Sequence, residues 1–168
     1  MHGDQPAALR VPAIVEFSSV TDLIVEADGG SRGNPGTAGA GALVRHPAGH
    51  VLAARAVPLG RASNNVAEYS GLIAGLELVR DLDPHAAVEV RMDSKLVVEQ
   101  MSGRWKIKHD DMKRLAHQAS QILSPMQVTY TWIPREQNGD ADRLSNEAMD
   151  ASAAGTAWDP TASSVHVA

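Results

Sequence analysis

Hydrophobic and polar residues follow two spacings along this chain, and each spacing predicts one kind of element. Short apolar runs rich in β-branched residues predict strands, whereas apolar residues three or four positions apart predict amphipathic helices. The expected strands cover residues 23–27, 38–45, 50–57, 87–92 and 128–133. The expected helices cover residues 64–80, 94–101, 110–123 and 140–153. The elements therefore occur in the order βββ-α-β-α-α-β-α.

This order predicts an α/β domain built on a five-stranded mixed sheet with helices on its faces. We expect the first three strands to form an antiparallel hairpin arrangement and the last two, which alternate with helices, to run parallel. Residues 21–154 would form this domain. Residues 1–20 lack a clear period and predict a flexible extension, and residues 155–168, rich in small side chains, predict a mobile tail.

Composition limits the class of protein. The chain has 168 residues, 43% of them hydrophobic, which predicts one globular domain rather than a disordered chain. The absence of cysteine excludes a disulfide scaffold and a cysteine-ligated metal site, and it agrees with a cytoplasmic location. No apolar run approaches the roughly 20 residues of a membrane span, and no signal-peptide pattern opens the chain. The formal net charge of −5 argues against a nonspecific nucleic-acid coat protein, so any basic surface must be local.

Four acidic residues stand at the ends of predicted elements. Asp28 follows the first strand and precedes a loop rich in Gly, Asn and Pro, and Asp93 follows the fourth strand. Glu68 and Asp142 fall in the first turns of their helices, and Glu68 shares a helix face with Leu72. Such positions can converge on one place, where four carboxylates would repel one another unless cations neutralised them. The pattern therefore predicts two Mg²⁺ ions that bridge a phosphate.

Each acid, taken alone, also has an ordinary structural explanation. Asp28 can start a turn, and Asp93 can cap the helix that follows it. Glu68 fits the spacing of a capping box, and Asp142 fits the favourable placement of an acid near a helix N-terminus. We expect the neighbouring Asp140 to be the N-cap of the last helix. The case for a joint site depends on the four acids occurring together.

Four blocks of sequence around these acids resemble the motifs of type 1 ribonuclease H. The resemblance covers about residues 22–153, the blocks stand in the family's order, and the first two are the most specific. The chain looks most similar to compact bacterial and archaeal variants, some of which are fused to a C-terminal phosphatase-like domain. The blocks are Asp28-Gly29-Gly30-Ser31-Arg32-Gly33-Asn34-Pro35-Gly36, Ser63-Asn64-Asn65-Val66-Ala67-Glu68, Met92-Asp93-Ser94 and Ala141-Asp142-Arg143-Leu144.

The resemblance implies a ribonuclease H-like fold and a metal-dependent endoribonuclease. In that family the acids that match Asp28, Glu68, Asp93 and Asp142 hold two Mg²⁺ ions, with Mn²⁺ as a possible substitute. The RNA strand of an RNA–DNA hybrid is cut, leaving 5′-phosphate and 3′-hydroxyl ends. The implied partner is therefore an RNA–DNA hybrid and not a membrane, and a monomer is the favoured state.

Polar residues in the first two blocks are candidates for holding the hybrid. Small residues and amides suit minor-groove edges and 2′-hydroxyls, which separate RNA from DNA, although such residues equally form turns and caps. Two further residues match a family site that holds a phosphate of the DNA strand. The candidates for the minor groove and the 2′-hydroxyls are Gly29, Asn34, Asn64 and Asn65, and the candidates for the phosphate site are Arg61 and Ser63.

The chain departs from the family pattern in two loops. Many members carry an extra helix rich in Lys and Arg after the third acid, but here residues 104–109 form only a short basic connector. Its Trp105 and Lys106 could grip the DNA strand, or the connector could be a solvated loop with one packed Trp. The loop before the last acid often carries a His, whereas here it offers Arg135, which could attract the scissile phosphate or help the product leave.

Two other functions stay open. The same kind of carboxylate site serves resolvases, transposases and exonucleases that act on DNA. The second of these functions is a noncatalytic nucleic-acid-binding module, but a protein that only binds nucleic acid gains nothing from negative charge beside phosphates. The Asn-rich second block and the short fold favour the hybrid nuclease.

Overall fold

The computed structural model describes residues 20–168, which form a five-stranded mixed sheet. The order across the sheet is β3-β2-β1-β4-β5. β1, β2 and β3 pair antiparallel, whereas β4 runs parallel to both β1 and β5. The predicted mixed sheet is therefore confirmed. The strands are β1 (Leu23–Gly33), β2 (Gly36–Arg45), β3 (Val51–Ala62), β4 (Val88–Met92) and β5 (Val128–Trp132).

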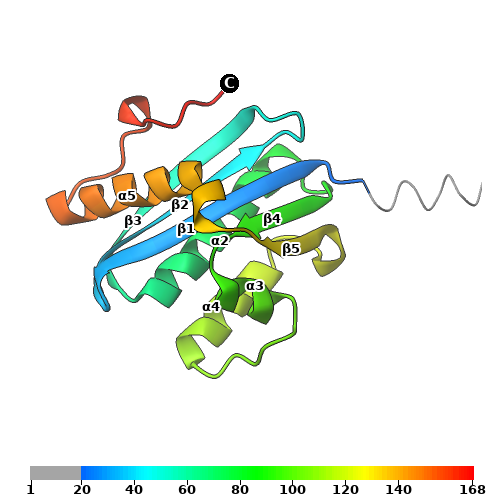
Figure 1. The fold of residues 1–168 in the computed structure, drawn as a ribbon, viewed down its shortest axis with the longest axis horizontal. Helices are drawn as coiled ribbons and strands as arrows, with labels where there is room; N and C mark the ends of the chain where they lie inside the picture. The colour runs from blue at the N-terminus through cyan, green and yellow to red at the C-terminus, as the bar shows by residue number, and fades with distance from the viewer. Residues whose placement is uncertain (1–19) are drawn as a thin grey trace, which may run out of the picture.

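Helices cover both faces of this sheet (Figure 1). On one face α2 packs against β1, β2 and β3, and α4 packs against α2. On the other face α5 crosses β1, β2 and β3. The helices are α2 (Asn64–Leu82), α3 (Lys95–Met101), α4 (Asp110–Ser120) and α5 (Gly139–Ala154), with 3₁₀ turns η1 (Pro125–Gln127), η2 (Arg135–Gln137) and η3 (Pro160–Ala162).

The hydrophobic core is divided by the sheet. The larger cluster joins β1, β2 and β4 to α2, α3 and α4, and it includes the predicted stripe residues Leu72, Leu76 and Val79. A smaller cluster lies under α5 and includes Leu43 and Leu144. None of the helices formed by residues 20–168 combines the length and apolar character that a bilayer span requires.

The first strand is longer than its apolar run predicts. We expected it to stop before Asp28, but it continues to Gly33 because its antiparallel pairing with β2 extends that far. Its parallel pairing with β4 ends earlier, at Glu26. Asp28 therefore lies inside a strand rather than in a loop. It comes just after the last β1 residue that pairs with β4, and Asp93 comes just after the end of β4, so the two acids lie at the same end of this parallel pair.

Three helix starts differ from the expected caps. α2 is capped by Ser63, whose Oγ accepts a hydrogen bond from Val66 N at 3.2 Å, so Glu68 lies beyond the first turn and is not part of a capping box. α3 is capped by the side chain of Ser94, not by the aspartate before it. The N-cap position of α5 belongs to Asn138, which leaves Asp140 inside the first turn.

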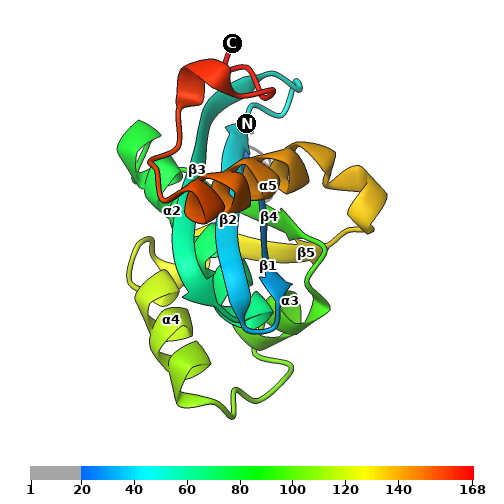
Figure 2. The same cartoon turned by 90° about the vertical axis from the view of Figure 1, so that its left-hand side faces the viewer.

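The segment after α5 packs on the domain instead of leaving it. Trp158 Nε1 donates a hydrogen bond to Glu147 Oε1 at 3.0 Å, and Val165 is buried in the smaller cluster. Figure 2 shows this segment returning toward the turn between β2 and β3, where Ala168 N donates to Val51 O at 2.8 Å. Packed structure thus extends past residue 154, whereas the expected mobility of the tail stays a prediction. Residues 1–19 of the expected extension lie outside the described residues.

Candidate active site

The four predicted acids line one cavity of about 360 Å³, which we call the acid cavity. Asp28 comes from β1, Glu68 from α2, Asp93 from the turn between β4 and α3, and Asp142 from the first turn of α5. These elements meet here because β4 ends beside the middle of β1, while α2 and α5 approach from opposite faces of the sheet. The structure therefore brings four acids from distant parts of the chain to one place.

Two glycines let α2 lie close against β1 at this cavity. A Cβ at Gly71 would collide with the carbonyl oxygen of Asp28, and a Cβ at Gly29 would collide with that of Ala67. Backbone atoms cannot move aside as the end of a flexible side chain can, so only glycine fits both positions. Their absent side chains bring Glu68 next to Asp28. Gly29, which we expected to contact the hybrid, thus has a packing role as well as lining the acid cavity.

The acid cavity raises the pKa of two of its carboxyl groups. Burial, followed by the negative charge of Asp93, raises the pKa of Asp28 to about 7, and Asp142 and Glu68 add to the shift. Burial also raises the pKa of Glu68 to about 7, with a hydrogen bond from Ser94 opposing the shift and the charge of Asp93 adding to it. The ionised forms are therefore unfavourable in this place without positive charge nearby.

Three side chains that sequence reasoning did not single out form hydrogen bonds with the acids. Ser94 had a signal in its position directly after Asp93, inside a motif block. Asn138 and Ser145 lie four residues before and three residues after Asp142, within one helical turn of it. The bonds run from Ser94 Oγ to Glu68 Oε1 at 3.1 Å, from Ser145 Oγ to Asp28 Oδ2 at 3.4 Å, and from Asn138 Nδ2 to Asp93 Oδ1 at 3.2 Å.

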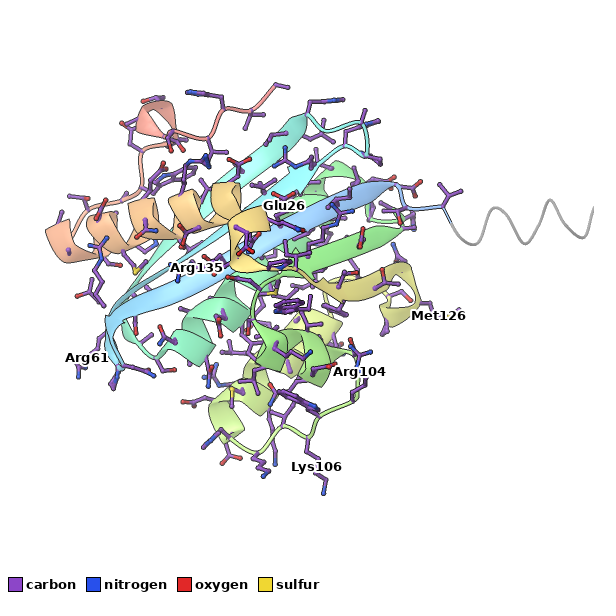
Figure 3. All side chains as sticks on the ribbon, viewed as in Figure 1. Glu26, Arg61, Arg104, Lys106, Met126 and Arg135 are labelled. Carbon is purple, nitrogen blue, oxygen red and sulfur yellow. The ribbon has the colours of Figure 1, made fainter. Side chains whose placement is uncertain are left out.

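Arg135 brings a positive charge to the edge of the acid cavity. It lies just before α5, near the centre of the view in Figure 3. Its Nη2 is 3.8 Å from Asp142 Oδ1, and 79% of its side chain is exposed. Because the guanidinium is held by one long ion pair and is open to solvent, it can turn toward an incoming anion.

The amide residues expected to hold the hybrid tie the β1–β2 hairpin to the start of α2. Asn64 Oδ1 accepts a hydrogen bond from Ser31 N at 2.9 Å, and Asn64 lines the acid cavity. Asn34 Oδ1 accepts from Asn64 N at 3.2 Å, and Ser63 is occupied as the cap of α2. Arg61 is exposed at the end of β3, well separated from Arg135 in Figure 3.

A second cavity, of about 550 Å³, lies beside α3 and α4, and we call it the basic cavity. Arg104 forms an ion pair with Glu99, while Trp105 is 46% exposed. Figure 3 shows Arg104 and Lys106 below the sheet, away from Arg135. Asn65 belongs to this cavity and not to the acid cavity, although its neighbour Asn64 lines the acid cavity. Its polar and aromatic lining includes Asn65, Arg104, Trp105, Lys106, Lys108 and His109.

The donor set of the acid cavity fits a hard divalent cation, because all four predicted ligands offer carboxylate oxygens. Among residues 20–168, no three acidic or histidine side chains already lie where they could share one ion. Small rotations of the acids toward an ion would therefore accompany binding. Hydrogen bonds from serine and asparagine limit how far the side chains can turn.

The sequence of this chain is similar to those of known proteins. Residues 26–148 match the reverse transcriptase-like family. The bifunctional protein Rv2228c of Mycobacterium tuberculosis is 56% identical over 140 residues, which cover 82% of this chain and 38% of that protein. The chain thus spans less than half the length of this relative.

Two solved structures show the same architecture. The N-terminal RNase H domain of Rv2228c, solved as a fusion with maltose binding protein, has a TM-score of 0.76 and 53% identity, covering 81% of this chain and 99% of that one. LC11-RNase H1 in complex with an RNA/DNA hybrid has a TM-score of 0.69 and 39% identity, covering 76% of this chain and 96% of that one. With the family match over residues 26–148, these likenesses show that the chain belongs to the reverse transcriptase-like family and is an RNase H-like domain.

Proposed function

We propose that this chain is a metal-dependent endoribonuclease that hydrolyses the RNA strand of RNA–DNA hybrids, leaving 5′-phosphate and 3′-hydroxyl ends. The observation that carries the proposal is the convergence of Asp28, Glu68, Asp93 and Asp142 on one cavity. Burial and mutual repulsion make these charges costly, and a protein that only bound nucleic acid would gain nothing from them. The likeness to an RNase H1 solved with an RNA/DNA hybrid supports the substrate.

We assign the four acids as ligands of two Mg²⁺ ions, with Mn²⁺ as a substitute of similar ligand preference. When bound, such ions supply an activated water and stabilise negative charge on the reacting phosphate. The protein's part is to hold the ligands: Ser94 and Ser145 restrain Glu68 and Asp28. Arg135 would attract the phosphate at the edge of the cavity, because its guanidinium stays charged at neutral pH.

The hybrid would lie across both cavities. Asn64, which lines the acid cavity, and Asn34, which accepts a hydrogen bond from Asn64 N, would contact minor-groove edges and 2′-hydroxyls of the RNA. In the basic cavity, Lys106 would bind phosphates of the DNA strand, and Trp105 would offer an exposed ring to a sugar or base. The remaining candidates for the hybrid are Gly29 and Asn65 near its minor groove, and Arg61 and Ser63 at a DNA-strand phosphate.

A cleavage assay on three substrates of one sequence tests the proposal: an RNA–DNA hybrid, an RNA duplex and a DNA duplex, each with Mg²⁺ or with chelator. We expect cleavage of the RNA strand in the hybrid, only with Mg²⁺, and 5′-phosphate on the products. Cutting of the DNA duplex would assign the site to a DNA nuclease. Binding of the hybrid without cleavage under any metal would make the domain a binding module.

A cytoplasmic location and a monomeric state stay predictions. The absence of cysteine supports a reducing compartment for the first. Light scattering of the purified chain tests the second, with a mass near 17.8 kDa expected.

A further inference from the structure

Asn138 is a fully buried polar residue at the N-cap position of α5, between the elements that carry the predicted acids. Its Nδ2 donates one hydrogen bond to Ala27 O at 2.9 Å and another to Asp93 Oδ1 at 3.2 Å. The backbone carbonyl oxygen of Asn138 accepts a hydrogen bond from Asp142 N at 3.0 Å. One residue thus contacts the peptide group that precedes Asp28, the carboxylate of Asp93 and the backbone of Asp142.

The orientation of the Asn138 amide is determined by its surroundings. Both groups near Nδ2 are acceptors, so a flipped amide would place its oxygen against two other oxygens. In the observed orientation, Oδ1 is buried and has no hydrogen-bonding partner among residues 20–168. A buried acceptor without a partner destabilises a protein, and an apolar side chain of the same size would avoid that cost. Because Oδ1 contributes no hydrogen bond, we infer that the amide is needed at this position for the two hydrogen bonds that its Nδ2 donates.

Asp93 is held at a second point as well. Trp132 Nε1 donates to Asp93 O at 3.2 Å, which fixes the backbone of the turn between β4 and α3. The Asn138 amide then restrains the carboxylate at the end of that side chain through Oδ1, while Oδ2 accepts no hydrogen bond from residues 20–168. Carboxylates that bind metals commonly have such a hydrogen-bonded partner, and loss of that partner weakens metal binding.

We propose that Asn138 is the positioning residue of the acid cavity: it orients the carboxylate of Asp93 and sets the spacing of β1, the β4–α3 turn and α5 around the metal ions. This inference rests on the proposed function, since it concerns the same site. Asn138 would act through Asp93 and would not touch the substrate.

The test compares Asn138→Ala with Gln127→Ala. Gln127 is a matched control because its Nε2 also donates to two oxygens, Pro84 O and Ala86 O, at a place remote from the acids. Thermal melting reports stability, calorimetric titration of Mg²⁺ without hybrid reports affinity, and the Mg²⁺ concentration for half-maximal cleavage reports the assembled site. We expect Asn138→Ala to weaken Mg²⁺ binding about 10-fold or more in both metal measurements. Gln127→Ala should lower the melting temperature without changing either measurement.

Unchanged Mg²⁺ affinity in Asn138→Ala, with a lower melting temperature, would overturn the inference and leave Asn138 a purely structural residue. If Asn138→Ala does not fold, the wild-type protein gives the answer by NMR. The side-chain amide signals of Asn138 should then shift during Mg²⁺ titration with the midpoint of metal binding, and unmoved signals would refute the role. Failure of wild-type protein to cleave any hybrid would instead refute the proposed function, which separates the two outcomes.

Discussion

The acid cavity and the basic cavity meet at the start of α2, where Asn64 lines the first and Asn65 the second, yet they are built differently. The acids stand on regular elements or in short turns between them, and hydrogen bonds restrain three of them. Much of the lining of the basic cavity comes from the connector at residues 104–109, whose Trp105 is exposed. Bond cleavage requires fixed ligand positions, whereas attraction of a phosphate backbone requires mainly charge. Changes in the acid cavity should therefore lower kcat, and changes in the basic cavity should raise KM.

The largest effect is expected from Asp28→Asn, which removes the carboxylate whose pKa is raised by the charges of all three other acids. We expect kcat to fall about 1,000-fold or more, because the substitution removes one of the four carboxylates that we propose as metal ligands. The melting temperature without divalent ions should rise, since burial and three neighbouring acids disfavour the carboxylate. Steady-state cleavage with saturating hybrid and thermal melting measure both effects. An active Asp28→Asn enzyme would remove the basis for assigning chemistry to this cavity.

Asp142 and Asp140 lie within one turn of α5 but are expected to have different roles. Asp142 lines the acid cavity, whereas Asp140 accepts hydrogen bonds from Arg45 Nη2 and Arg143 Nη1, both at 2.8 Å. We expect Asp142→Asn to reduce kcat about 100-fold. Asp140→Asn should lower the melting temperature and leave kcat nearly unchanged. The same cleavage and melting measurements on both variants decide the assignment, and the reverse pattern would exchange the two roles.

The sequence predicts the order of strands and helices and the convergence of the four acids, because hydrophobic periodicity and motif spacing can be recognised locally along the chain. It does not predict that β1 continues past Asp28, since that depends on pairing with β2 rather than on the composition of β1. The role of Asn138 depends on oxygens from β1 and the β4–α3 turn, which are distant in sequence. The packing of the tail likewise depends on Glu147 and on a pocket for Val165, which no local pattern reveals.

In the basic cavity, we expect the double change Lys106→Ala and Lys108→Ala to raise KM about 10-fold without changing kcat. No ion pair within residues 20–168 involves these two lysines, whereas Arg104 already pairs with Glu99. Each lost phosphate contact should also reduce the slope of log KM against log salt by about 0.7 to 0.9.

Lys113→Ala with Arg114→Ala is the matched control, since it removes the same charge from the exposed face of α4. KM measured at several salt concentrations distinguishes specific contacts from a general loss of positive charge. Equal effects in the two double variants would mean that the connector is a solvated loop that does not contact the DNA strand.

A smaller effect is expected from Arg135→Ala, which removes a cation from the edge of the acid cavity. We expect kcat to fall several-fold, because the proposed role of the guanidinium is to attract the phosphate or help the product leave, not to hold a metal. Arg135→Lys should restore part of the rate, since it keeps the charge but loses the planar fork. Single-turnover and steady-state rates together show which step slows. A loss as large as that of Asp28→Asn would place Arg135 at the reacting phosphate itself.

Glu147 shows how an acid outside both cavities behaves, and it carries the smallest prediction. Partial burial alone would raise the pKa of Glu147, but hydrogen bonds, led by the one from Ser164 N, outweigh burial and leave the pKa below its ordinary value. An acid with a lowered pKa adds stability above its ordinary pKa of about 4.3, and this stability is lost as pH falls through the lowered value. Glu147→Gln should therefore reduce the free energy of unfolding by about 1 kcal/mol at pH 7. Thermal melts of both proteins should converge as the pH falls below the lowered pKa of Glu147, because the wild-type carboxyl group then becomes protonated. Glu136→Gln, at an exposed position, is the control, and a Glu147→Gln difference that persists unchanged in acid would show that charge does not hold the tail.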